Sequence, residues 1–287
     1  MIDTSFLHHL DRMDLIVKRK INSNFQGERK SSEVGQGLVL QDYVQYTPGD
    51  DFRKIDWKVF ARSDRLFIKR FEEERNLTVH IMIDFSASMG FGKNTKKAEY
   101  ASEIGVGFAY IAMKNNERFV LSTFADKLEL FQPRRGRKQL AAIVEYLNSK
   151  RPSGVTNFLD ALSRYYKSQI RSKSLIVIIS DFLYGLDQIS EAIYRFKDHD
   201  VIMIQVLDEI ETELPFEGDY KLTDSESRSI MRTNLNPQLR KRYLDMMADH
   251  QARISRIAGE VHGNFFVVST KEQVFDAFYR ILTEGRV

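Results

Sequence analysis

"LTVHIMIDFSASMG", residues 77–90, runs from an apolar segment into a polar loop that begins at Asp84. The apolar part has the length and composition of a buried strand, and Asp84 stands at its carboxyl end. In the loop, Asp84, Ser86 and Ser88 alternate with Phe85 and Ala87. The stretch is therefore compatible with a metal site, with a phosphatase nucleophile, or with the polar cap of a buried strand.

Strands and helices alternate along the chain after this stretch. We expect strands at 77–84, 118–125, 127–133, 174–181, 200–208 and 264–269, and helices at 97–115, 137–149, 157–170, 186–198 and 271–282. Near-continuous apolar strands that alternate with helices indicate a parallel sheet covered on both faces. The sequence therefore predicts a doubly wound, mostly parallel α/β domain over residues 76–287. A surface hairpin and a long helix, at about 209–258, interrupt the alternation as an insertion.

The first 75 residues have a different character. Leu7, Leu10, Met13 and Val17 recur at helical spacing and predict an amphipathic helix. The following residues, 22–75, are rich in turn formers and contain short β-like pieces such as "GLVLQDYVQY", residues 37–46. We predict a small β-rich N-terminal module over residues 1–75.

Composition excludes several classes of protein. Of the 287 residues, 43 are Lys or Arg and 40 are Asp or Glu, so the formal net charge of +3 gives no case for nucleic-acid binding. The absence of cysteine excludes disulfides, thiolate metal sites and a cysteine nucleophile. Because no stretch reaches the roughly 18 apolar residues that a membrane-spanning helix needs, we expect no transmembrane segment and a cytoplasmic protein.

Oxygen-bearing side chains follow two of the most apolar strands. Asp84 ends the strand "HIMID", Asp181 ends "IVIISD", and Thr156 precedes the helix that begins near Asn157. In a doubly wound sheet, the carboxyl ends of the strands meet where the strand order reverses. Carboxylates, hydroxyls and water are the ligands of hard ions such as Mg²⁺. These residues therefore predict a divalent-cation site with one position left for a partner's acidic side chain.

The same residues resemble the metal-ion-dependent adhesion site of von Willebrand factor A domains. That site has the pattern Asp-x-Ser-x-Ser, a distant Thr and a distant Asp. All five positions are filled here, in order by Asp84, Ser86, Ser88, Thr156 and Asp181. The resemblance implies a von Willebrand factor A-like fold of Rossmann-type topology. It also implies that Mg²⁺, or another divalent cation, binds at these five residues.

A second resemblance lies upstream, in "YTPGDDFRKIDWKVFARSDRLFIKRFEEER", residues 46–75. This segment resembles the signature of a bacterial family of unknown function, which joins it to a von Willebrand factor A domain and is associated with MoxR-type AAA+ ATPases. The signature positions are Asp50, Asp51, Arg53, Asp56, Trp57 and Arg62. The resemblance implies a protein partner, either such an ATPase or its client, and a chaperone-like adaptor role. The residues themselves leave open a structural role, with Trp57 packed on the larger domain, or a surface that faces a partner.

Two catalytic interpretations fit the sequence poorly. A dehalogenase-like phosphotransferase needs a second Asp two residues after Asp84, where Ser86 stands. A serine hydrolase needs a Gly-x-Ser-x-Gly turn, which is absent around Ser86 and Ser88. We therefore expect a metal-dependent protein-interaction module that is not an enzyme. The alternatives are a structural scaffold without a functional metal and, less favoured, a metal-dependent hydrolase.

Overall fold

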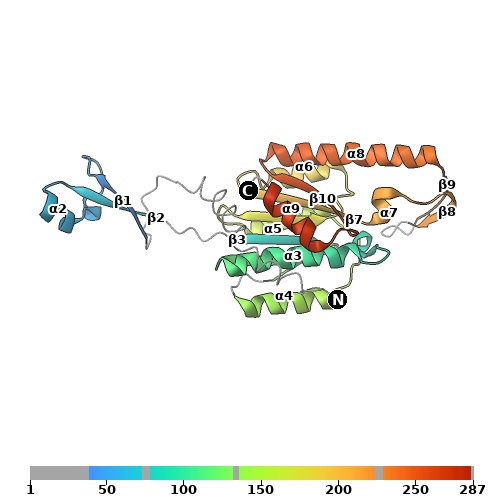
Figure 1. The fold of residues 1–287 in the computed structure, drawn as a ribbon, viewed down its shortest axis with the longest axis horizontal. Helices are drawn as coiled ribbons and strands as arrows, with labels where there is room; N and C mark the ends of the chain where they lie inside the picture. The colour runs from blue at the N-terminus through green and yellow to red at the C-terminus, as the bar shows by residue number, and fades with distance from the viewer. Residues whose placement is uncertain (1–38, 73–77, 132–135, 224–228, 286–287) are drawn as a thin grey trace. The chain divides into compact units, whose positions relative to one another are not determined.

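The computed structural model describes residues 39–72, 78–131, 136–223 and 229–285. The described residues divide into two compact units, a smaller one of residues 39–72 and a larger one within residues 78–285 (Figure 1). The amphipathic helix predicted from Leu7 to Val17 lies outside the described residues. None of the helices in the described ranges is long and apolar enough to cross a membrane.

The smaller unit contains a two-stranded antiparallel sheet, formed by β1 (Val39–Gln45) and β2 (Phe67–Glu72). Between the strands lie a single 3-10 turn, η1 (Phe52–Lys54), and a short helix, α2 (Trp57–Ser63). The described part of this unit confirms the prediction of a small N-terminal module with a β-sheet.

The larger unit is a mixed α/β structure around a six-stranded sheet. Its strands are β3 (Thr78–Asp84), β4 (Arg118–Phe124), β5 (Leu128–Leu130), β6 (Leu175–Ser180), β7 (Asp200–Leu207) and β10 (Asn264–Ser269). They lie in the order β10-β7-β6-β3-β4-β5, and β5 alone runs antiparallel to its neighbour. The predicted mostly parallel sheet is therefore confirmed.

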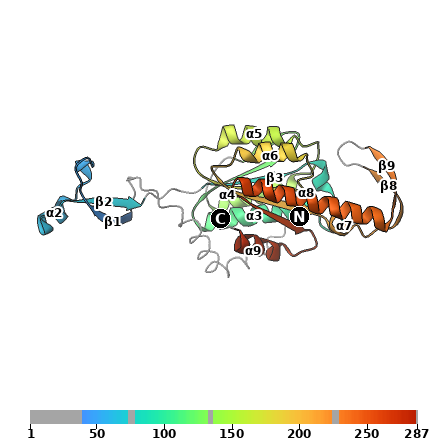
Figure 2. The same cartoon turned by 90° about the horizontal axis from the view of Figure 1, so that it is seen from above.

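Helices cover both faces of this sheet (Figures 1 and 2). The helical elements of the unit are η2 (Ala87–Gly90), α3 (Lys97–Lys114), α4 (Arg137–Ser149), α5 (Phe158–Gln169), α6 (Leu186–Tyr194), α7 (Glu209–Glu213), α8 (Pro237–Glu260) and α9 (Val274–Glu284). One hydrophobic cluster joins the sheet to α3, α4 and α9, and a second joins it to α5, α6 and α8. This two-sided burial explains why the central strands are apolar at nearly every position.

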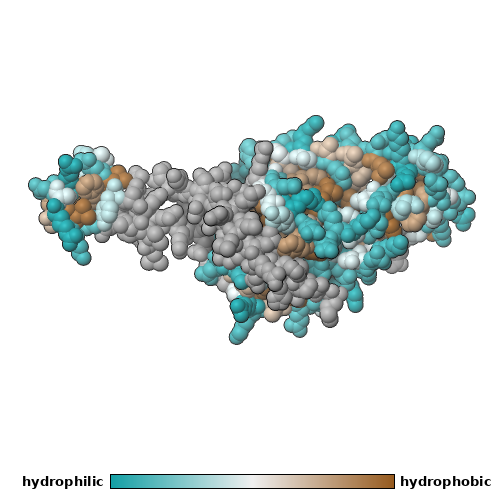
Figure 3. Space-filling model, in the orientation of Figure 1, coloured by the Kyte–Doolittle hydropathy of each residue, from teal (hydrophilic) through white to brown (hydrophobic). Residues whose placement is uncertain are grey.

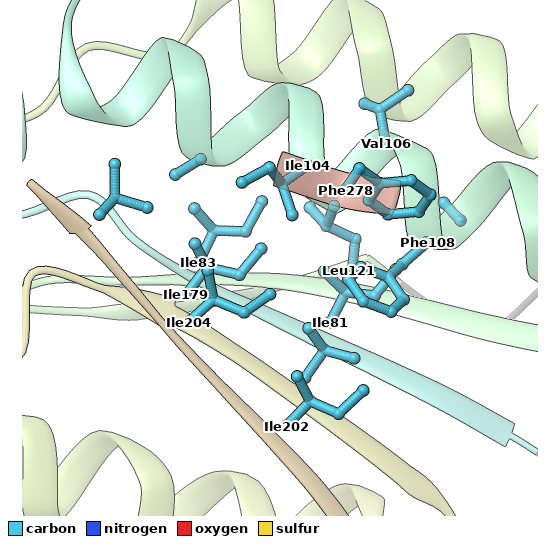
Figure 4. Close-up of a cluster of buried hydrophobic side chains, with 14 of the residues drawn as sticks. Ile81, Ile83, Ile104, Val106, Phe108, Leu121, Ile179, Ile202, Ile204 and Phe278 are labelled. Carbon is cyan, nitrogen blue, oxygen red and sulfur yellow. The ribbon is translucent and has the colours of Figure 1, made fainter. Parts of the chain in front are cut away.

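Strand β3 shows how the sequence builds both clusters. Ile81 and Ile83 pack toward α3, together with Phe278 of α9 (Figure 4), whereas Met82 between them belongs to the opposite cluster. All four side chains are buried. Helix α3 lies very close to its neighbours at Gly107, where an added Cβ would lie 2.9 Å from the Phe278 ring.

The strand order reverses beside β3, and this places the candidate site. From β3 the chain crosses through α3 to β4 on one side, and later returns through α5 to β6 on the other side. The ends of β3 and β6 are therefore neighbours at the carboxyl edge of the sheet. Such a reversal is where open α/β sheets bind ligands.

The insertion predicted after Asp208 is present. It consists of α7, a hairpin of β8 (Gly218–Thr223) and β9 (Ile230–Leu235), and the long helix α8. The sequence did not predict α7, because five residues are too few for a periodic pattern. Its start is nevertheless well defined, since Asp208 and Glu211 form a capping box.

Candidate metal centre

The carboxylate of Asp84 is fully buried at the end of β3 and accepts four hydrogen bonds. Its Oδ1 accepts one from the backbone N–H of Ser86 at 2.8 Å and one from the hydroxyl of Thr156 at 3.3 Å. Its Oδ2 accepts from the hydroxyl of Ser180 at 2.8 Å and from that of Tyr184. Three separate loops therefore converge on one carboxylate.

All four donors are neutral, and among the described residues no cation forms an ion pair with Asp84. The pKa of Asp84 is raised from 3.8 to about 6, mainly by burial and also by the nearby charge of Asp181, against the hydrogen bonds from Tyr184, Ser86 and Ser180. An isolated buried anion is costly unless a cation compensates it. The described residues of the centre therefore do not provide Asp84 with a compensating positive charge.

The hydroxyls of the loop after β3 lie beside this carboxylate. The Oγ atoms of Ser86 and Ser88 are 3.0 Å apart, and the backbone N–H of Ala87 donates to Gly154 O at 3.0 Å. Gly154 has a φ of +84°, which favours glycine. This bond ties the loop after β3 to the loop that carries Thr156.

Asp181 is placed at the same edge of the sheet but has its own cation. The Nζ of Lys97, which is completely buried at the start of α3, donates to Asp181 Oδ2 at 2.9 Å and to Glu211 Oε1 at 2.8 Å. Asp181 Oδ1 accepts from the backbone N–H of Leu183 at 3.3 Å. Burial alone would lower the pKa of Lys97, but the charges of Asp181 and Glu211 outweigh it and raise that pKa. Lys97 therefore stays charged.

The residue after Asp181 has a strained backbone. Phe182 is buried and has a φ of +51°, a conformation that is rare for a bulky side chain. It is held on both sides, because its N–H donates to Ser180 Oγ at 3.0 Å and its carbonyl lies 2.8 Å from Nε2 of His250. Strain of this kind is concentrated at functional sites.

The structure thus brings four of the five predicted ligands into one bonded group, namely Asp84, Ser86, Ser88 and Thr156. The fifth, Asp181, is near enough for its charge to act on Asp84 but is hydrogen-bonded elsewhere. Sequence reasoning missed Ser180, Tyr184, Lys97 and Glu211. Ser180 and Tyr184 flank Asp181 in "SDFLY" and had a signal there, whereas Lys97 and Glu211 meet only through the fold.

The donors of this centre are carboxylate and hydroxyl oxygens, which suit a hard divalent ion that keeps several waters. Within the described ranges, no group of three or more His, Cys, Asp or Glu side chains is arranged to hold a metal ion. A metal here would therefore be held by few carboxylates, and Asp84 is the one without a cation of its own.

Acids of the upstream signature have structural roles in the smaller unit. Asp50 accepts from the backbone N–H of Thr47 at 3.0 Å, and Asp51 accepts from that of Arg53 at 3.1 Å. Asp56 caps α2 by accepting from the backbone N–H of Lys58 at 2.9 Å, and it also accepts from a tyrosine hydroxyl.

The other signature residues lie at the surface. Trp57 is 59% exposed, and its ring meets that of Phe60 edge-on at 6.1 Å. Arg53 and Arg62 are also exposed. The acids of this signature therefore shape the backbone, whereas the aromatic and basic side chains face outward.

Comparison with known proteins gives a family but no activity. A family model described as "Protein of unknown function DUF58" matches residues 42–253. An uncharacterized protein of Mycobacterium tuberculosis is 27% identical over 251 residues, which cover 86% of this chain and 79% of that protein. The uncharacterized protein YeaD of Bacillus subtilis is 23% identical over 160 residues, which cover 54% of this chain and 37% of that protein.

Two solved structures resemble the chain more distantly. BatB from Bacteroides thetaiotaomicron aligns with a TM-score of 0.45 and 15% identity, covering 72% of this chain and 98% of that chain. An aerotolerance-related membrane protein from Bacteroides fragilis aligns with a TM-score of 0.47 and 18% identity, covering 72% and 99%.

Proposed function

The chain belongs to the DUF58 family, whose function is unknown, and we propose that it is a metal-ion-dependent protein-interaction module. We further propose that its larger unit is a von Willebrand factor A-like domain, with the metal centre at the carboxyl edge of the sheet. The observation that carries the proposal is the buried carboxylate of Asp84, which has four neutral donors and forms no ion pair with a cation of the described part of the chain.

In this proposal, Asp84, Ser86 and Ser88 hold a Mg²⁺ ion from the loop after β3. Thr156 joins it directly or through water. Asp181 acts either as a direct ligand or without contacting the ion itself, and its contact with Lys97 favours the second role. The ion supplies the missing positive charge and one coordination position that a partner's carboxylate completes.

The net charge of the buried group favours a divalent ion. Asp84, Asp181 and Glu211 contribute three negative charges when ionised, and Lys97 contributes one positive charge, so the sum is −2. Burial raises the pKa of Glu211 as well as that of Asp84, as expected for carboxylates with too little compensating charge. One Mg²⁺ would neutralise the group, and a monovalent ion would not.

Exposed apolar side chains near the centre favour a protein as the ligand. Phe91 follows η2, Val155 precedes Thr156, and Leu183 follows Asp181, and all three are exposed. Each of the three site loops therefore carries a large hydrophobic side chain at the surface. Apolar groups around a polar centre are typical of protein interfaces.

The proposed partner is a MoxR-type AAA+ ATPase or its client, which would present the acidic residue. The support for it is the resemblance of the upstream segment, residues 46–75, to the signature of a family associated with such ATPases. The chain would then act as a non-enzymatic adaptor during assembly or maturation of a complex.

One observation favours the second candidate, a scaffold without a functional metal. The Lys97 ammonium already neutralises Asp181 without any metal. The two candidates differ in what Mg²⁺ does. A functional metal centre requires that Mg²⁺ bind the purified protein and raise its melting temperature, whereas a scaffold requires neither.

The experiment is a calorimetric Mg²⁺ titration of chelator-treated protein, followed by capture of the ATPase with and without Mg²⁺. Asp84→Asn should abolish Mg²⁺ binding and reduce capture at least tenfold. Asp208→Asn is the matched control, because Asp208 is buried at the end of β7 and caps α7. Equal Mg²⁺ binding by the wild type and Asp84→Asn would contradict the proposed centre.

A further inference from the structure

The β8–β9 hairpin has two open edges. The two strands pair antiparallel with each other, and in the described part of the chain neither pairs with another strand. The hairpin lies at the end of the larger unit where α8 begins (Figures 1 and 2). An open edge presents backbone N–H and C=O groups to which an added strand can bond.

One face of the hairpin is apolar. Leu222 lies opposite Met231, and the alternation of side chains along a strand puts Tyr220 and Leu235 on this same face. Leu235 is buried where the hairpin meets the body, but Met231 is 61% exposed and Tyr220 and Leu222 are also exposed. Hydrophobic surface appears among hydrophilic side chains elsewhere on the larger unit too (Figure 3), but here it lies along open strands.

The opposite face carries an unfavourable pair of like charges. Lys221 lies directly opposite Arg232, and both are exposed. Like charges at opposed positions destabilise a sheet. On the same face, Asp219 accepts a hydrogen bond from its neighbour Asn234 at 2.8 Å, and Thr223 lies opposite Ile230. Among the described residues, neither Lys221 nor Arg232 has an acidic partner.

Positive charge continues into the next element. Arg240, Lys241 and Arg242 lie in the first two turns of α8, whose first turn contains no acidic residue. Cations near a helix N-terminus oppose the helix dipole. The hairpin and the first two turns of α8 thus gather five cations.

We propose that this hairpin binds an extended, acidic segment of a partner protein as a third strand. In such a segment, apolar and acidic residues alternate. The period of two then places the apolar side chains beside Leu222 and Met231 and the acidic ones beside Lys221 and Arg232. The interaction is independent of the metal centre.

Two other occupants fit the surface less well. A second copy of the hairpin would bring Lys221 and Arg232 beside their own counterparts and add to the repulsion. A membrane surface offers no backbone groups to pair with the open edges of β8 and β9, whose N–H and C=O groups would stay unpaired against lipid. An extended acidic peptide can pair with an open edge, and its acidic side chains are attracted to Lys221 and Arg232.

The test uses a fluorescein-labelled peptide of eight alternating Val and Glu residues, titrated with the full chain and followed by fluorescence anisotropy. Peptides with Lys in place of Glu, or with two central Val residues replaced by Pro, are the controls. We expect the Glu peptide to bind at least tenfold more tightly than either, and more weakly as salt rises from 50 to 300 mM, because exposed charges are screened.

The decisive variant is the double reversal Lys221→Glu with Arg232→Glu, which should no longer bind the Glu peptide and should bind the Lys peptide instead. The matched control, Lys167→Glu with Arg171→Glu, changes the charge equally at and just after the end of α5 and should keep the wild-type preference. Circular dichroism confirms that each variant is folded. Hydrogen exchange should show new protection in β8 or β9 on peptide addition.

Three results would each overturn the proposal. The first is no binding of the Glu peptide by the wild type at 1 mM, and the second is equal binding of the proline peptide. The third is co-sedimentation of the protein with phosphatidylserine vesicles that the double reversal abolishes and the Glu peptide does not affect. That result would identify a membrane surface as the occupant. A charge preference that inverts with the double reversal supports the proposal.

Discussion

Replacing the central carboxylate by its neutral isostere, Asp84→Asn, should stabilise the metal-free protein. Burial raises the pKa of Asp84 from 3.8 to about 6, so the folded state holds the proton more tightly than the unfolded state does. The associated stability is fully present below pH 3.8 and is lost as pH rises through about 6. A difference of about 2 pKa units corresponds to about 3 kcal/mol at pH 7.

The groups that hydrogen-bond to Asp84 can also hydrogen-bond to an asparagine side chain. Ser180 and Tyr184 donate to Oδ2 through hydroxyl groups, which can rotate and accept from an amide instead. The backbone N–H of Ser86 and the hydroxyl of Thr156 keep a carbonyl oxygen at Oδ1. We therefore expect Asp84→Asn to raise the free energy of unfolding of the chelator-treated protein by about 2–3 kcal/mol at pH 7, and by much less at pH 4.

The measurement is urea unfolding of the larger unit by far-ultraviolet circular dichroism, at both pH values and with or without Mg²⁺. Tryptophan fluorescence would report on the wrong unit, because the one tryptophan of the chain, Trp57, lies in the smaller unit. Asp208→Asn is the control and should change stability by less than about 0.5 kcal/mol, since Asn caps a helix about as well as Asp. A loss of stability in Asp84→Asn at pH 7, or an unchanged response to Mg²⁺, would refute the reasoning.

Three further changes test other parts of the larger unit. Burial lowers the pKa of His80 from 6.5 to about 4, so the neutral ring contributes about 3 kcal/mol of stability that is present above pH 6.5 and lost as pH falls through 4. In His80→Leu, the free energy of unfolding should therefore change less between pH 7 and pH 4 than in the wild type, and an equally steep change would contradict this. Lys97→Met should destabilise the metal-free protein by about 3–5 kcal/mol, because it leaves the buried carboxylate of Asp181 and the partly buried one of Glu211 without their cation. The rise in melting temperature on Mg²⁺ addition should exceed that of the wild type, and a smaller rise would argue against a metal beside this lysine. Gly107→Ala should lower the free energy of unfolding in urea by about 1–2 kcal/mol despite the better helix propensity of alanine, since the new Cβ would lie 2.9 Å from the ring of Phe278. Gly259→Ala, with open space around it, should leave that free energy unchanged or raise it.

The elements that the sequence predicted best are those whose pattern has sharp ends. Helix α4 begins and ends at the predicted residues, 137–149, and β10 does so at 264–269, because each pattern stops abruptly at polar or turn-forming neighbours. The helix predicted to begin near Asn157 does so, with Asn157 as the N-cap of α5, where it accepts from the backbone N–H of Asp160. Local chemistry determined these boundaries, so sequence alone sufficed.

The site was only partly predictable for the opposite reason. Asp84, Ser86 and Ser88 lie in one loop and form a visible pattern. Lys97 and Glu211 are 114 positions apart and meet only because α3 and α7 begin at the same edge of the sheet. A lysine at the first position of a helix has no local feature that distinguishes it from a solvent-exposed lysine, so its complete burial could not be predicted.

Lys97 also determines how a metal at this centre would affect the insertion. It links Asp181, at the end of β6, to Glu211 of α7, whose carbonyl accepts a hydrogen bond from the hydroxyl of Tyr243 in α8 at 2.9 Å. A divalent ion at Asp84 would bring positive charge toward a lysine that the two carboxylates keep ionised. We expect the repulsion to weaken the Lys97–Asp181 contact first, because Asp181 is the carboxylate whose charge acts on Asp84. Lys97 would then bind Glu211 more strongly, and amide exchange in α7 should slow on Mg²⁺ addition in the wild type but not in Lys97→Met.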